Sequence, residues 1–122
     1  MLQIKRAYEE PSSKDGERIL VDRLWPRGLT KARAAIDLWM KEIAPSPTLR
    51  KWFAHDPAKW KQFRQRYFKE LQEHPQAVDQ LRKKARRGRV TLVHSARDEQ
   101  HNGALALKMY LERGRRKLGA AR

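Results

Sequence analysis

The chain contains no cysteine in its 122 residues. Disulfide bonds, thiolate zinc sites and cysteine nucleophiles are therefore excluded. The chain also lacks any apolar run near the roughly 18 residues that a membrane-spanning helix needs, and residues 1–6 lack the pattern of a signal peptide. We expect a cytoplasmic protein without a membrane partner, and the length suits a single domain with one hydrophobic core.

Metal-binding patterns are missing as well. The four histidines, at positions 55, 74, 94 and 101, show none of the spacings that hold metal ions. No Gly-x-Ser-x-Gly run surrounds Ser95, so the pattern of a serine hydrolase is also missing. The sequence therefore predicts no metal and no cofactor.

Positive charge dominates what is present. Lys and Arg outnumber Asp and Glu by 29 to 14, which gives a formal net charge of +15, and eleven of these charges lie in residues 82–89 and 113–122. Neither run contains an acidic residue or an aromatic one. Such runs are typical of solvated helix ends and tails, and also of surfaces that bind nucleic acid. The cations of the first run are Arg82, Lys83, Lys84, Arg86, Arg87 and Arg89.

Hydrophobic periodicity predicts three strands and about five helices. The strands are 2–6, 18–22 and 90–93. The helices are 31–43 after a Thr30 cap, 47–53 after a Ser46 cap, one that carries Trp60 to Leu71 and ends near His74, one from Ala77 closed by Gly88, and 99–113 after an Asp98 cap.

These elements predict an α/β fold with one domain over residues 1–112 and a mobile basic tail over 113–122. We expect a small, mainly parallel, three-stranded, Rossmann-like sheet wrapped by the helices. The connection between the first two strands is short for a parallel crossover, so an antiparallel pairing of the first strand stays open.

Two of the strands run into dense polar clusters. Residues 19–21 lead into Asp22 to Gly28, and residues 90–93 lead into His94 to Asn102. The helices between them allow a parallel crossover, which brings both strand ends to one edge of the sheet. Ligands bind at that edge in open α/β sheets, so the sequence predicts a site there.

The first cluster suits an anion. Arg23 and Arg27 are four residues apart, and Pro26 stiffens the turn, so the two guanidinium groups are candidates for a fork around a phosphate or carboxylate. Asp22 could orient an arginine, accept a hydroxyl hydrogen bond or act as a base. A plain ion pair that closes the sheet edge is the structural alternative.

The second cluster offers a helix start and a histidine. Free N–H groups and the positive end of the helix dipole favour anions and disfavour a charged His101, which leaves a neutral His101 as a donor or general base. Asp98 is the other catalytic candidate, and Ser95, Asn102 and His55 are candidates for ligand binding. The alternative is that Asp98 caps the helix, that His101 and Asn102 are ordinary first-turn residues, and that His55 belongs to a capping turn.

Several motifs together resemble a known family. They are Asp15-Gly16, Leu20 to Gly28, Ala44-Pro45-Ser46, Leu49-Arg50, Trp52 to Pro57 and Asp98 to Asn102. With them, the chain up to about Leu111 resembles the YeaO-like branch of the domain-of-unknown-function family 488, and the Asp-Arg-Leu-Trp-Pro-Arg-Gly run is the most specific.

The resemblance implies no particular activity, because the family has none established. The wider family pairs an Asp-Val-Arg segment after one strand with a cysteine-containing segment after the last, where this chain has His94 and Ser95. The YeaO-like pattern also tends to place a second histidine after Asn102, where this chain has Gly103.

Two functions follow as hypotheses. The first is binding of a phosphorylated or nucleotide-like small molecule by the residues of the two clusters, with proton transfer by His101 or Asp22 left open. The second is nucleic-acid binding or regulation by the two basic runs, without catalysis. The sequence leaves open whether the protein is an enzyme, and it does not indicate an oligomeric state.

Overall fold

A parallel sheet of four strands lies at the centre of the computed structural model, which describes residues 1–120, with side chains described as far as Arg113. The strands are β1 (Leu2–Arg6), β2 (Glu17–Leu20), β3 (Leu38–Trp39) and β4 (Val90–His94), in the spatial order β1-β4-β2-β3. The predicted α/β fold with a parallel sheet is confirmed, with four strands where the sequence predicts three.

The pairing of β1 is parallel, so the antiparallel alternative is wrong. β1 pairs with β4, which lies between β1 and β2. Residues 7–16 only have to return along the sheet to the start of β2. Ten residues can reach roughly 33 Å, about twice the length of a five-residue strand, so this return needs no α-helix.

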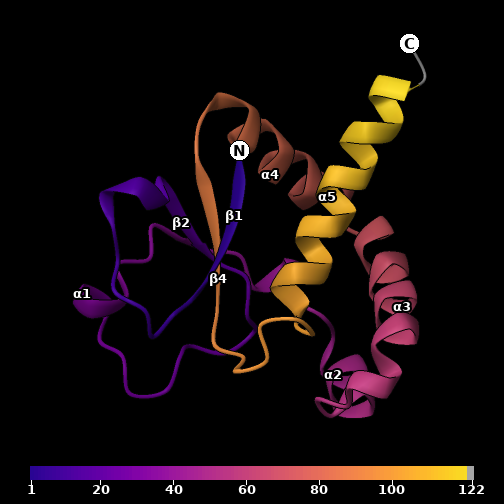
Figure 1. The fold of residues 1–122 in the computed structure, drawn as a ribbon, viewed down its shortest axis with the longest axis horizontal. Helices are drawn as coiled ribbons and strands as arrows, with labels where there is room; N and C mark the ends of the chain where they lie inside the picture. The colour runs from indigo at the N-terminus through magenta and orange to yellow at the C-terminus, as the bar shows by residue number, and fades with distance from the viewer. Residues whose placement is uncertain (121–122) are drawn as a thin grey trace.

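The helices cover mainly one face of the sheet. The α-helices of the described residues are α1 (Lys31–Ala34), α2 (Pro47–Phe53), α3 (Trp60–Gln72), α4 (Pro75–Arg87) and α5 (Gly103–Ala120). In Figure 1, α3 and α5 lie on one side of the sheet and α1 with its flanking loops on the other. None of the helices in these residues has the length and apolar character needed to cross a membrane.

Two apolar clusters explain this layering. Ile19 and Leu92 face the larger cluster, together with buried residues of α3, α4 and α5. Leu20 and Val93 face the smaller one, against Trp25 and neighbours from the loops around α1. Because both faces of the central strands are covered, every residue of β4 is buried, as is typical of parallel sheets.

The predicted helix over residues 31–43 is wrong. The structure divides this segment into α1, β3 and a 3-10 turn, η2 (Lys41–Ile43). α1 ends because Ala35 adopts a left-handed conformation with φ of 50°. The guanidinium of buried Arg18 donates hydrogen bonds to the carbonyls of Ala34 and Ala35, and Asp37 exchanges hydrogen bonds with the backbone of Arg18. These contacts draw the segment onto the edge of β2 as β3.

The predicted bounds of the last helix also differ. α5 begins at Gly103, where the sequence predicts Glu99, and its backbone continues past the predicted end at Gly114 to Ala120. Asn102 caps it, since its Oδ1 accepts the N–H of Leu105 at 2.8 Å. The mobile tail predicted over 113–122 stays a prediction, because for these residues the structure describes only the α5 backbone as far as Ala120 and the side chain of Arg113, and residues 121–122 lie outside the described residues.

A buried charge cluster anchors the beginning of β2. The Asp15 carboxylate accepts hydrogen bonds from Arg18 at 2.6 Å and from Lys5 at 3.2 Å, and the Ser12 N–H adds another. Burial by itself would raise the pKa of Asp15, but these hydrogen bonds and the charge of Lys5 outweigh it and lower the pKa. Gly16 has a φ of 66° and leaves no room for a Cβ against the Arg89 carbonyl, so this approach requires glycine.

We expect Arg18→Met to destabilise the protein by roughly 3–5 kcal/mol, because it removes the buried guanidinium partner of the Asp15 carboxylate and frees the carbonyl of Ala34. Urea unfolding measures this loss. Lys84→Met is the control, because the pair of Lys84 with Glu17 is partly exposed and should cost at most about 1 kcal/mol. Equal effects of the two variants would contradict the assignment of Arg18 as the anchor.

Candidate functional site

The two polar clusters meet at the carboxyl edge of the sheet. β2 and β4 pair in parallel, so Asp22 and Ser95 follow them side by side. The backbone N–H and the hydroxyl of Ser95 both donate to Asp22 Oδ2, at 2.8 and 2.7 Å. The indole of Trp39 donates to the backbone carbonyl of Asp22 at 2.7 Å. Asp22 therefore connects the ends of three strands, which gives it a structural role whatever else it does.

Asp98 and His101 form a hydrogen-bonded pair in the loop before α5. Asp98 Oδ2 lies 2.9 Å from His101 Nδ1, and Asp98 Oδ1 accepts the N–H groups of Gln100 and His101. The bond from the Gln100 amide, followed by the bond from His101, lowers the pKa of Asp98. An ionised carboxylate only accepts, so Nδ1 carries the hydrogen and Nε2 is the ring nitrogen left for a ligand.

The ring of His101 is held from a second side. Trp60 of α3 meets it edge to face, with centroids 5.4 Å apart and planes at 82°. The ring is only partly exposed. A fixed ring with one free nitrogen is suited to hydrogen-bonding a ligand or moving a proton.

Asn102 is used differently from its neighbours. Its amide caps α5 through Leu105 and donates to the Asp98 carbonyl at 2.9 Å, and the residue is 3% exposed. The amide nitrogen and the amide oxygen of Asn102 are therefore both hydrogen-bonded within the protein. The helix cap that the sequence predicts at Asp98 is therefore at Asn102, while Asp98 accepts the N–H groups of the turn before α5.

A cleft of about 950 Å³ opens at this edge of the sheet. All the catalytic and ligand-binding candidates of the sequence line it except Arg27. Phe53 and Phe63 contribute an aromatic wall. The volume lies within the range of roughly 300–1,000 Å³ that is typical of small-molecule sites.

Arg23 and Arg27 do not share this cleft. Arg23 lines it, and its guanidinium also donates to the carbonyls of Ala44 and Pro45. Arg27 lines a separate, smaller hollow and is exposed. The structure thus does not place the two in one fork, because the Trp25-Pro26 turn carries Arg27 past the strand end.

Sequence reasoning missed three cations of the cleft. Arg50 and Lys51 come from the exposed side of α2, and Arg97 follows β4. Leu49 and Phe53 are buried, so the amphipathic pattern of α2 could have indicated that residues 50 and 51 face outward. The pattern does not indicate that α2 lies beside the strand ends, which is a tertiary fact.

His55 also lines the cleft, from the turn after α2. It is exposed and adopts a left-handed conformation with φ of 55°, directly after Ala54 with φ of 48°. Two consecutive left-handed residues without glycine are uncommon. The next residue, Asp56, caps η3 (Pro57–Lys59), so both the site role and the capping-turn alternative for this region keep support.

His94 is a titratable residue that the site prediction passes over. It ends β4, is 3% exposed, and its Nδ1 has no hydrogen-bond partner among the described residues. Burial lowers the pKa of His94, the Asp22 carboxylate opposes this shift, and the Arg6 guanidinium adds to it. The imidazole is therefore neutral at physiological pH.

The basic run over 82–89 is largely engaged within the chain. Arg82 donates to the Tyr110 carbonyl, Lys83 pairs with Asp79, Lys84 pairs with Glu17, and Arg89 donates to the Lys14 carbonyl. Nucleic-acid binding by this run stays a prediction, and the engaged cations leave mainly Arg86 and Arg87 to carry it.

No group of three or more metal-ligating side chains occurs among the described residues. The described site therefore consists of hydrogen-bonding and charged groups: the Asp22–Ser95 and Asp98–His101 pairs, Arg23, and the cations Arg50, Lys51 and Arg97.

Fold and cleft together define a class of small α/β proteins with a four-stranded parallel sheet and a cationic cleft at the carboxyl ends of its strands. The chain belongs to the DUF488-N3i family, described as the inactive DUF488-N3 subclade, whose model matches residues 1–119. The predicted membership in the YeaO-like DUF488 group is thereby confirmed.

Relatives match over most of their length. The uncharacterized protein YeaO of Escherichia coli is 44% identical over 110 residues, which cover 90% of this chain and 96% of that protein. The uncharacterized protein Rv3073c of Mycobacterium tuberculosis is 37% identical over 110 residues, which cover 90% of this chain and 92% of that protein. No solved structure gives a significant match.

Burial of His94 predicts a loss of stability in mild acid. Below the ordinary pKa of about 6.5, the unfolded chain takes up a proton that the folded chain resists. Stability is thus fully present above that pH and falls as the pH drops toward the folded pKa, by at most about 2 kcal/mol at pH 5. Urea unfolding at pH 7.5 and pH 5 measures this. His94→Leu should flatten the profile and exposed His74→Leu should not, and a profile unchanged in His94→Leu contradicts the assignment.

Proposed function

We propose that the cleft at the carboxyl ends of β2 and β4 binds a phosphorylated or nucleotide-like small molecule. The observation that carries the proposal is the set of cations around it. Arg50, Lys51 and Arg97 line the cleft, and none of the three forms an ion pair within the described residues. Three exposed charges of one sign on one cleft attract an anion and raise its local concentration.

The donors suit phosphate. Arginine offers a planar fork, lysine adds a point charge, and His101 Nε2 adds a directional hydrogen bond. Arg23 brings a further guanidinium, held by the carbonyls of Ala44 and Pro45. The aromatic wall of the cleft gives the uncharged part of a ligand a surface to contact.

Binding without turnover is the favoured form of this function. The family model is described as inactive, and the chain has no cysteine to act as a nucleophile. Ser95 donates its hydroxyl hydrogen to Asp22, so Asp22 Oδ2 is already occupied by two hydrogen bonds. The available chemistry is therefore recognition, with the Asp98–His101 pair as a fixed donor or acceptor.

The cations should carry the affinity. We expect orthophosphate or ribose 5-phosphate to raise the melting temperature of the wild type, and Arg50→Ala to weaken binding by at least about tenfold, since a charge-assisted hydrogen bond contributes roughly 1.5–3 kcal/mol. Lys51→Ala should weaken it less, as a single point charge. Thermal shift and titration calorimetry measure these effects.

Arg33→Ala is the matched control, because it removes the same charge from an exposed position of α1 outside the cleft. It should bind as the wild type does. If Arg50→Ala and Arg33→Ala weaken binding equally, the effect is one of net charge and the cleft is not the site. If no phosphorylated probe stabilises the wild type at millimolar concentration, the proposed function fails.

The histidine should act through its free nitrogen. His101→Phe keeps an aromatic ring against Trp60 but removes Nε2 together with the Nδ1 bond to Asp98, so we expect several-fold weaker binding of ribose 5-phosphate and a loss of stability of at most about 1 kcal/mol from the partly exposed pair. Calorimetry and urea unfolding separate the two quantities. Unchanged affinity in this variant would restrict His101 to a structural role in the loop before α5.

A further inference from the structure

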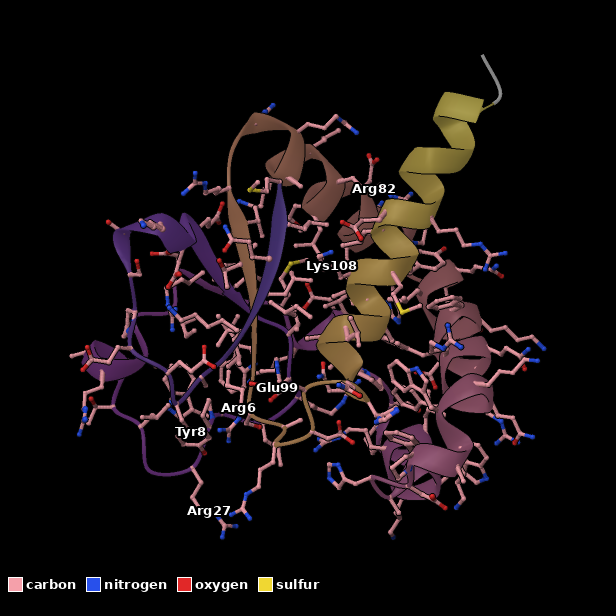
Figure 2. The ribbon with its side chains drawn as sticks, in the orientation of Figure 1. Arg6, Tyr8, Arg27, Arg82, Glu99 and Lys108 are labelled. Atoms are coloured by element: carbon pink, nitrogen blue, oxygen red, sulfur yellow. The ribbon has the colours of Figure 1, made fainter. Side chains whose placement is uncertain are left out.

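The cleft has a neighbour that the proposed function does not use. A hollow of about 480 Å³ lies beyond Asp22 and Ser95, lined also by Tyr8, Leu24, Trp25 and Arg27. It forms at the ends of β1 and β2, where Figure 2 shows Tyr8 and Arg27 at the same end of the molecule. Two of the large hydrophobic side chains that are exposed in the described residues, Tyr8 and Leu24, line it.

Tyr8 stands in this hollow as a fixed and accessible ring. Its hydroxyl donates to the Arg27 carbonyl at 3.0 Å, and the Arg6 guanidinium lies 5.4 Å from the ring centroid. Arg6 is itself held, since its Nε donates to the Ala96 carbonyl at 2.9 Å. The residue nevertheless stays 45% exposed. A ring oriented at its hydroxyl and backed by a cation is prepared to stack on a planar group.

Leu24 and Trp25 extend the apolar surface beside it. Leu24 is 69% exposed, although it lies only four residues after the end of β2. Trp25 is held in place, because its indole donates to the Leu29 carbonyl at 2.7 Å and its ring meets Trp39 edge to face at 5.5 Å. A rigid indole next to an exposed leucine gives an apolar ligand group a second contact.

The hollow and the cleft join at shared residues. Asp22, Arg50 and Ser95 line both of them. A ligand whose anionic group lies against Arg50 can therefore extend in either direction past the Asp22–Ser95 pair. Together they offer the cations of the cleft, the Asp22–Ser95 pair that lines both, and the rings of Tyr8 and Trp25 in the hollow.

We propose that the hollow receives the base of a nucleotide whose phosphate lies in the cleft by Arg50. This inference rests on the proposed function and adds the class of ligand and its orientation. The base stacks on Tyr8 beside Leu24 and Trp25, and the ribose passes Asp22 and Ser95, where a carboxylate and a hydroxyl can hydrogen-bond its hydroxyl groups.

Three probes test the base separately from the phosphate. AMP and UMP carry a base, and ribose 5-phosphate carries the same sugar and phosphate without one. Calorimetry on the full chain should give roughly tenfold tighter binding of AMP than of ribose 5-phosphate, and a smaller gain for UMP, because purines stack more extensively. Tyr8→Ala should bring AMP down to the affinity of ribose 5-phosphate and leave ribose 5-phosphate unchanged.

Tyr8→Phe is the matched control, because it keeps the ring and removes only the hydroxyl bond to Arg27. It should retain most of the preference for AMP. If ribose 5-phosphate binds as tightly as AMP to the wild type, or if Tyr8→Ala keeps the preference, the inference is overturned while the proposed function stands. If none of the three probes binds the wild type, both the inference about the base and the proposed function fail.

Discussion

The carboxylate of Asp22 accepts two hydrogen bonds from Ser95, while its backbone carbonyl accepts a third from Trp39. These bonds join the ends of β2, β3 and β4 at the point where the sheet stops. Asp22 and Ser95 line both the cleft and the hollow, so this junction forms the boundary between the two cavities. The shape of the site thus depends on the parallel pairing of β2 with β4.

The charged residues at the two ends of the sheet differ in burial and pairing. At the amino end of β2, Arg18 and Asp15 are buried and paired, so their charges serve the fold. At the carboxyl end, Arg50 and Arg97 are exposed and form no ion pair within the described residues. A buried and paired arginine contributes to the fold. An exposed and unpaired arginine is the one whose charge can attract an anion.

Much of this arrangement is readable from the sequence, because strands that end in polar clusters follow a general rule of α/β sheets. The sequence misses β3, since Ala32, Ala35, Ile36 and Trp39 also fit a helical period, and the deciding contact comes from the buried Arg18. The sequence also misses Arg50 as a cleft residue, because its position depends on tertiary packing. The pattern of α2 indicates which side chains face outward, but the packing of α2 against α3 decides which surface they face.

The arrangement of Ser95, His101 and Asp98 bears on whether the cleft catalyses. A hydrolytic triad would need the serine hydroxyl on the histidine. Here that hydroxyl donates to Asp22, and His101 is bonded to Asp98 alone among the described side chains. The serine is therefore held as part of the sheet junction, and the histidine keeps its free nitrogen for whatever enters the cleft. Among the described side chains, Ser95 and His101 therefore do not form the serine–histidine pair of a hydrolytic triad.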